Sequence, residues 1–465
     1  MLYAERITRS LGEISMLQAV ASALRITELR RKIFFTLGML LIYRLIAHIP
    51  VPYTNAAALK GVLENNQLLG ILNLFSGGAL QSFSVAAMGV YPYITASIIV
   101  QLLQPLIPRL EEWSKEGEAG RNKINRLQYY LTVPLALLQA YGQTLTFARA
   151  TAGSTNGLFE TGFDFNLFSG QYFLPTFMIL LSMTAGTLLL VWMGELIDEK
   201  GIGNGISMII FGGIVARLFA TIGGFFQTGS SSASFIGTFA FLVIMLLTLF
   251  AIVVVQEGVR RIPVQYMRRM KGNKVYGGQS THIPLKVNMA GMIPLIFAQS
   301  ILIFPGTVAS YFCNLADQTG GGIGNKVACG IYNTFSPQQS NGNVVYSLML
   351  FLMVVGFTYF YTVVLFAQQN LPESLRSNGG FIPGIRPGKA TEVYLGRVLN
   401  RITLPGALFL GLVAVLPYLT AGLTGVANVG LSATAMLIVV GVAVDAMRQL
   451  ESQLLMRNYE GYITR

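Results

Sequence analysis

Long apolar runs separated by short polar loops dominate the pattern of hydrophobic and polar positions along this chain. A helix needs ~20 successive apolar residues to cross a bilayer, and ten runs come near that length. These runs cover residues 33–50, 84–104, 127–148, 172–193, 206–226, 235–255, 289–311, 344–366, 398–418 and 430–448. The pattern therefore predicts an all-α polytopic membrane protein with ten transmembrane helices.

A short apolar piece, Leu74 to Leu80, comes directly before the second predicted span. It is too short to cross a bilayer. The span that follows contains Pro92, which predicts a kink. A short piece set before a kinked span is typical of a re-entrant segment that dips into a helical bundle. Periodicity alone favours a plainer alternative, an interfacial helix followed by an ordinary span with a packing kink.

Charge is scarce and unevenly distributed. The chain is 53% hydrophobic and 11% charged, and a soluble protein usually carries about twice that share of charge. Only Lys60, Arg149 and Lys326, of 32 Lys and Arg, fall in the loops on one side of the predicted membrane. The positive-inside rule therefore places both termini in the cytosol. The net charge of +12 then belongs to the cytosolic face, where it favours anionic lipid or an acidic partner surface.

The N-terminal segment, residues 1–32, shows no cleavable signal pattern. Within it, Leu11 to Ile26 has the apolar spacing of an amphipathic helix. We expect this helix to lie on the cytosolic membrane surface, with packing on a loop or a partner as the alternative.

The polar loop 227–234 divides the chain into residues 33–226 and 235–450, with five predicted spans in each half. Residues 451–465 form a cytosolic tail. Because five is odd, a structural repeat of the two halves must be inverted in the membrane. Inverted repeats usually place the working site between the halves, near the membrane midplane.

Candidate catalytic chemistry is sparse. The only histidines, His48 and His282, fall on opposite sides of the predicted membrane, so neither a metal site nor a catalytic triad is supported. The glycine-rich stretches 201–207 and 320–324 lack the lysine of a phosphate-binding loop. Every Asp and Glu lies in a loop or at a span end, whereas ion-coupled transporters bury a carboxylate in the membrane. We expect no enzyme and no cofactor, although a facilitator, or a transporter that uses backbone carbonyls, stays open.

The two cysteines, Cys313 and Cys329, both fall in the predicted exoplasmic loop 312–343. An oxidising compartment would favour a disulfide between them. Two unpaired thiols are an equally good interpretation of the spacing.

Four motifs lie in this order among the predicted spans: GGALQSFSVAAMGVYPYITASIIVQLL, GIGNGIS, STHIPLKVNMAGMIP (280–294) and FIPGIRPGKAT (381–391). Together they resemble the SecY family, the central subunit of the bacterial and plastid protein-conducting channel. The resemblance runs from about Glu28 to Gln453. The resemblance implies two inverted five-helix halves around an hourglass pore, which translocates unfolded polypeptides passively and under gated control.

In SecY-like proteins the short segment after the first span is a plug beneath a ring of aliphatic side chains at the pore waist. The resemblance places the plug on Ile71, Leu72, Asn73, Leu74, Phe75, Ser76, Gly77, Gly78, Ala79 and Leu80. It places the ring on Val90, Ile94, Ile206, Ile210, Ile296 and Ile438. Branched apolar side chains cannot replace the hydration of an ion, so such a ring resists ion flow. Without the resemblance, each ring residue would be interpreted as facing lipid or packing between helices.

The family also opens sideways, between spans two and three on one side and seven and eight on the other, and releases apolar segments into lipid. Gln101 and Gln299 lie in spans two and seven. Amides buried in hydrocarbon seek partners across helix interfaces, so we expect both to help latch this gate. The alternative is a local bond within each helix.

Two cytosolic loops, 256–288 and 367–401, resemble those that dock the ribosome or the SecA motor. Their basic residues suit ribosomal RNA phosphate or an acidic protein face, although such charges often only set topology. The expected docking residues are Arg260, Arg261, Arg268, Arg269, Lys271, Lys274, Arg386 and Lys389. Arg386 stands between Pro383 and Pro387 and matches the contact arginine of the family.

The resemblance implies the small membrane subunits SecE and SecG, and a SecA-type ATPase or the ribosome as the source of work. It places the chain in a bacterial inner membrane or a thylakoid, where it would pass unfolded polypeptides and signal sequences. The alternatives are a secondary transporter or facilitator for a small solute and a structural membrane scaffold.

Overall fold

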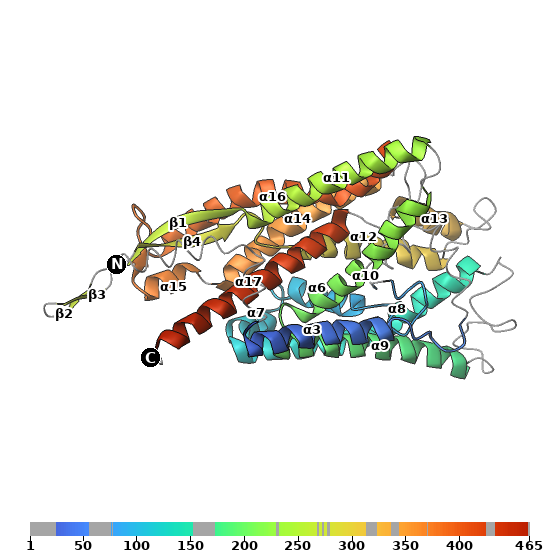
Figure 1. The fold of residues 1–465 in the computed structure, drawn as a ribbon, viewed down its shortest axis with the longest axis horizontal. Helices are drawn as coiled ribbons and strands as arrows, with labels where there is room; N and C mark the ends of the chain where they lie inside the picture. The colour runs from blue at the N-terminus through green and yellow to red at the C-terminus, as the bar shows by residue number, and fades with distance from the viewer. Residues whose placement is uncertain are drawn as a thin grey trace. The chain divides into compact units, whose positions relative to one another are not determined.

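The computed structural model describes residues 25–54, 76, 78–151, 173–228, 232–266, 269–271, 274–276, 280–312, 323–335, 344–369, 371–424 and 433–463. The chain forms two compact units. The first contains Met1–Ala96, Tyr129–Gly223 and Ile438–Arg465, and the second contains Ser97–Gln128 and Gly224–Leu437. Each unit is mostly helical, as Figure 1 shows.

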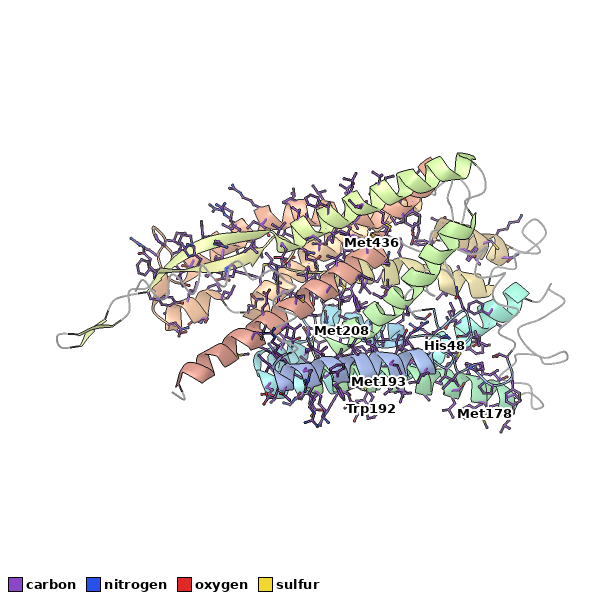
Figure 2. All side chains as sticks on the ribbon, viewed as in Figure 1. His48, Met178, Trp192, Met193, Met208 and Met436 are labelled. Carbon is purple, nitrogen blue, oxygen red and sulfur yellow. The ribbon has the colours of Figure 1, made fainter. Side chains whose placement is uncertain are left out.

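The first unit is built on α3 (Thr27–Ile46) and α9 (Phe173–Lys200), which pack against each other (Figure 1). Most of α10 (Gly205–Thr228) belongs to it. Neighbouring side chains show the two faces of α9: Met193 is 2% exposed, whereas Trp192 is 55% exposed (Figure 2). An apolar outer face on a helix of this hydropathy is typical of contact with lipid.

Besides α10, whose last residues belong to the second unit, three helices begin in one unit and end in the other. They are α6 (Tyr91–Leu103), α8 (Glu118–Thr151) and α17 (Ala433–Ile463).

The second unit is built from helices that pack in pairs. The contacts join α14 (Val344–Gln369) with α16 (Lys389–Thr424), and α12 (Ile293–Phe312) with both α13 (Ile323–Phe335) and α14. Aromatic rings fill the space between α12 and α14, where Phe297 meets Tyr361 edge to face at 5.9 Å between ring centres. The unit also contains α7 (Pro108–Lys115), α11 (Ser232–Glu257) and α15 (Leu371–Ser377).

Short strands, which the hydrophobic pattern did not predict, form between these helices (Figure 1). An antiparallel sheet has the order β4-β1-β5, from β4 (Ser280–Lys286), β1 (Val259–Tyr266) and β5 (Gly380–Phe381). A separate hairpin joins β2 (Arg269–Lys271) to β3 (Lys274–Tyr276). One face of the sheet is buried, with Ile262, Val264 and Leu285 in a core that also contains Leu395 of α16. That burial on alternate residues fixes the register of the sheet.

A helix covers the greater part of each run predicted to span the membrane. Three candidates are long and apolar enough to cross a membrane by themselves among the parts of the chain that the structure describes: α9 (Phe173–Lys200), the run Val344–Ser377 that contains α14 and α15, and Lys389–Tyr418 of α16. A fourth candidate is a pair, Tyr91–Leu103 and Pro108–Ser114, bent by 104°. The number of ten spans stays a prediction.

The second predicted span differs from its expected form. Its helix, α6, begins at Tyr91 and not near residue 84, and turns occupy residues 85 to 90. Pro92 is the second residue of α6, where a backbone N–H has no acceptor within the helix. The predicted kink at Pro92 is therefore wrong: this proline starts the helix and does not bend it.

Candidate functional site

The candidate site begins with the segment between α3 and α6, where the sequence predicts a re-entrant plug. Ile71, Leu72, Asn73, Leu74, Phe75 and Gly77 lie outside the described residues. Ser76 and the chain from Gly78 to Val90 form successive turns, and most of their side chains are buried. We call this segment, Ser76 with Gly78 to Val90, the plug base.

A buried tyrosine of α3 holds the start of the plug base. The hydroxyl of Tyr43 donates a hydrogen bond of 2.8 Å to the backbone oxygen of Ser76. The Ser76 hydroxyl oxygen accepts a bond of 3.3 Å from the Leu80 N–H, which closes the first turn. Tyr43 and Ser76 are each 1% exposed. A hydrogen bond between two buried groups is costly to break, because each would lose its partner away from water.

A short antiparallel pairing ties the middle of the plug base to the chain that leaves α3. Pro50 and Ser84 face each other in an isolated bridge. The Val51 N–H donates to the Phe83 oxygen at 2.9 Å, and the Val85 N–H donates to the Ile49 oxygen at 3.0 Å. The chain that follows α3 and the plug base therefore share main-chain hydrogen bonds.

The side chains of the plug base complete the apolar core of the first unit. Leu80 and Phe83 are fully buried in a cluster with Met183 of α9. The Phe83 ring meets Phe147 edge to face, with 5.7 Å between ring centres. Phe83 also has a backbone φ of 40°, which bulky residues rarely adopt. The surrounding core and the pairing with Val51 hold this strained residue in place.

A glycine on α9 allows the plug base to approach closely. A Cβ atom at Gly186 would overlap the backbone carbonyl of Val85. No other residue type fits there without a shift of the backbone. Gly89, with φ of 57°, then reverses the chain before α6 begins.

Five of the six predicted ring residues belong to the first unit and one, Ile296, to the second. Val90 directly precedes α6, and the others lie on α6, α10, α12 and α17. Every ring residue is buried except Ile206, which is half-buried beside Gly194 of α9. Burial alone does not distinguish a pore waist from helix packing, so the ring stays a prediction.

The two predicted gate glutamines both belong to the second unit. The Gln101 amide donates a 3.1 Å hydrogen bond to the Ser97 hydroxyl, one turn earlier on α6. Its side-chain oxygen is buried and has no partner among the described residues. Gln299 is buried on α12. The Gln101 bond joins two residues of the same helix, as in the alternative of a local bond. A latch across the gate stays a prediction.

The two predicted docking loops meet in the sheet of the second unit. Gln265 and Tyr266 of loop 256–288 pair with Phe381 and Gly380 of loop 367–401. Arg260 and Arg261 are exposed on β1. Backbones of Arg269, Lys271 and Lys274 form the β2–β3 hairpin, and Arg268 lies outside the described residues.

Arg386 is exposed in a tight turn before α16, and Lys389 is the exposed first residue of that helix. The Arg386 backbone oxygen accepts a 2.9 Å bond from the Thr391 hydroxyl. Gly384 and Gly388 flank the turn with φ of 83° and 106°. This hydrogen bond and the flanking prolines limit the freedom of the backbone that carries the guanidinium.

Cys329 is buried on α13 and takes part in a disulfide. The other cysteine of the chain, Cys313, lies outside the described residues. Among the described residues, no group of His, Cys, Asp and Glu is arranged to hold a metal ion.

Two polar arrangements were missed by the sequence analysis. One is the bond from Tyr43 to Ser76. The other joins three helices of the first unit: the Tyr129 hydroxyl of α8 donates to the Glu195 carboxylate of α9, and the Tyr93 ring of α6 stacks on Tyr129. Each joins residues distant in sequence, and no local spacing signals either one.

The SecY family model matches residues 84–447 of the chain. The protein translocase subunit SecY of Mycobacterium tuberculosis is 43% identical over 460 residues, which cover 96% of this chain and all of that protein. The SecY subunit of Thermus thermophilus is 43% identical, over 97% of this chain and 98% of that protein. The SecY subunit of Bacillus subtilis is 41% identical, over 96% of this chain and all of that protein.

Solved structures of low sequence identity share the fold. One, described as a protein conducting channel, is 18% identical with a TM-score of 0.61, over 90% of this chain and 91% of that one. Another, Sec61 in the canine ribosome-channel complex from the endoplasmic reticulum, is 17% identical with a TM-score of 0.60 over the same shares. The chain belongs to the SecY family, because the family model matches most of its residues and a relative 43% identical to it aligns over nearly its whole length.

Proposed function

We propose that this chain is the pore-forming subunit of a protein translocase, a passive gated channel for unfolded polypeptides. The observation that carries the proposal is its 41–43% identity, over nearly its whole length, to proteins named as translocase subunits. The plug base supports it, because the chain between α3 and α6 is fixed to the scaffold where a plug is expected. The chain is not an enzyme.

The proposed pore lies between two inverted halves, residues 33–226 and 235–450. The plug closes its waist at rest. The waist is the predicted aliphatic ring of Val90, Ile94, Ile206, Ile210, Ile296 and Ile438. A dry ring of branched side chains resists ions, because it offers them no substitute for water. The same side chains make no specific bonds, so they can part around a sliding polypeptide.

The proposed lateral gate lies between spans two and three on one side and seven and eight on the other. Gln101 and Gln299 each add a polar group to a gate helix. A polar bond between membrane helices is worth only about 1 kcal/mol. An arriving signal sequence could therefore displace such a bond and enter the lipid.

The work of transport must come from partners. The likeness to Sec61 in a ribosome-channel complex supports docking of the ribosome on the two loops joined by β1 and β5. We propose a SecA-type motor as the second driving partner, and SecE and SecG as small membrane subunits. The bacterial relatives favour a bacterial inner membrane, with both termini in the cytosol and anionic lipid at the basic face.

Reconstitution tests this function. Vesicles containing the chain with its small subunits should import an unfolded secretory precursor when the motor and ATP are added, and should import none without the motor. Counterflow of a small solute in vesicles that import no precursor would instead favour a transporter.

A further inference from the structure

The plug base contains residues that the sequence assigned to the plug itself. Ser76, Gly78, Ala79 and Leu80 fall within the predicted plug, 71–80, yet they bond and pack as parts of the scaffold. A segment that moves with each transport event would have to break these contacts each time.

Ser76 is held through both its backbone and its side chain. Its backbone oxygen accepts from the Tyr43 hydroxyl at 2.8 Å and from the Ala79 N–H at 3.2 Å. A carbonyl oxygen has two lone pairs, so both bonds are satisfied together. The Ser76 hydroxyl oxygen accepts from the Leu80 N–H. Gly78, with φ of 87°, supplies the left-handed residue that this turn needs.

The groups on the other side of these contacts belong to the fixed part of the unit. Tyr43 is on α3, which packs along α9. Leu80 and Phe83 are in the core with Met183 of α9. Ser82 adds a 2.8 Å bond from its hydroxyl to the Ala47 oxygen, just after α3 ends. Among the described residues named here, the anchors of the plug base lie on helices of the first unit or on the chain that leaves α3.

We propose that Tyr43 positions the fixed end of the plug, so that Ser76, Gly78, Ala79 and Leu80 stay with the scaffold while the channel works. Any displacement during transport then ends before Ser76. This inference rests on the proposed function, and it removes Ser76, Gly78, Ala79 and Leu80 from the part of the predicted plug that is displaced. A short tether from a fixed point keeps a plug near its seat and favours its return.

Hydrogen exchange of the membrane complex tests this inference in two states, at rest and with a secretory chain stalled in the pore. The backbone N–H groups of Ala79, Gln81, Phe83, Ser84 and Val85 all donate hydrogen bonds in the plug base. We expect their exchange to be equally slow in both states. Exchange as fast as in an unstructured peptide, seen only with the stalled chain, would show that the plug base moves with the plug and would overturn the inference.

The Tyr43→Phe variant tests the anchor itself. It removes one hydroxyl and leaves the ring in place, so exchange at Ala79 and Leu80 should rise roughly fivefold in the resting complex. Tyr346→Phe is the matched control, because Tyr346 is also 1% exposed but lies on α14 of the second unit. It should leave the plug base unchanged. Unaltered exchange in Tyr43→Phe, or the same rise in both variants, would remove the role of Tyr43.

The two proposals fail in different ways. A complex that imports no precursor contradicts the proposed function. The resting-state comparison of Tyr43→Phe with Tyr346→Phe needs no transport and still decides whether Tyr43 anchors the plug base. A transporting complex whose plug base loses protection contradicts only the inference about the boundary.

Discussion

Gln265 of β1 pairs with Phe381 of β5, and this pairing joins the two predicted docking loops, which are more than a hundred residues apart in the sequence. The next pair, Tyr266 with Gly380, extends the ladder. One sheet thus joins the backbones of both loops, and it carries Arg260 and Arg261 on β1. Partners that dock on these loops should therefore respond to changes in either one.

Gly380→Val should separate the two loops. A Cβ atom at Gly380 would lie 3.0 Å from the Tyr266 ring and 3.3 Å from Leu375, both tighter than ordinary contact. Overpacking of this kind costs about 1–3 kcal/mol. We expect ribosome binding and motor-driven transport to weaken together. Gly396→Val is the control, since a Cβ there meets nothing within 4 Å. Equal binding by both variants would contradict a shared docking sheet.

Arg386→Glu should impair motor-driven transport and leave the complex assembled. The exposed guanidinium is on a turn that prolines and the Thr391 bond restrain, so little entropy is lost on docking. A buried interfacial charge pair that loses one partner costs about 2–5 kcal/mol, and a reversed charge should reduce transport at least tenfold. Arg376→Glu makes the same charge change on α15, at a side chain that is 65% exposed. Normal transport by Arg386→Glu, or equal loss in Arg376→Glu, would refute the assignment.

Gly186→Ala should displace the plug base from α9. The added methyl group would overlap the Val85 carbonyl, which belongs to the backbone and cannot rotate away. We expect a stability loss of about 1–3 kcal/mol and a higher ion conductance of the resting channel. Gly356→Ala, on an open face of α14, should be neutral or slightly stabilising. Thermal unfolding and planar-bilayer conductance measure both effects, and unchanged values for Gly186→Ala would contradict the close approach.

Two deletions separate the plug from its base. Removing residues 71–75 should raise resting ion conductance while the unit keeps its stability. Removing residues 71–80 should raise conductance and also lower stability, because the fully buried Leu80 and the Tyr43 bond are lost. Equal stability of the two shortened chains would show that Ser76 and Leu80 do not support the fold. Unchanged conductance in both would count against a plug at this position.

The hydrophobic pattern predicts where helices form, because a membrane span needs a long apolar run and each run contains a helix. It does not predict where α6 begins. That boundary depends on the bridge between Pro50 and Ser84, which joins positions that no local periodicity connects. A proline inside a helix predicts a kink, whereas a proline in the first turn is compatible with a straight helix. Pro92 belongs to the second case, because α6 begins one residue before it.

The sheet was missed for a related reason. β1 has the sequence VRRIPVQY, in which charged residues and a proline hide the alternation of its buried positions. Its partners, β4 and β5, lie in separate parts of the chain. Short strands of this kind are stabilised by packing, here on Leu395 of α16, more than by intrinsic preference.

Among site residues, the family motifs predict positions that local chemistry does not single out. The predicted plug is mostly apolar or small residues and the predicted ring is entirely apolar, so composition does not distinguish either from lipid-facing positions. Tyr43 went unnoticed because one tyrosine in an apolar run carries no signal. Its role becomes visible only when folding brings it to Ser76, 33 positions later.

The most direct test places a photoreactive residue at Ile94 and, separately, at Ile296, and stalls a secretory polypeptide halfway through the reconstituted complex. Both positions should crosslink to the stalled polypeptide, whereas exposed Trp192 on the outer face of α9 should not. Absence of crosslinks at both positions, with the precursor still imported, would show that polypeptide does not pass the aliphatic ring and would contradict this account.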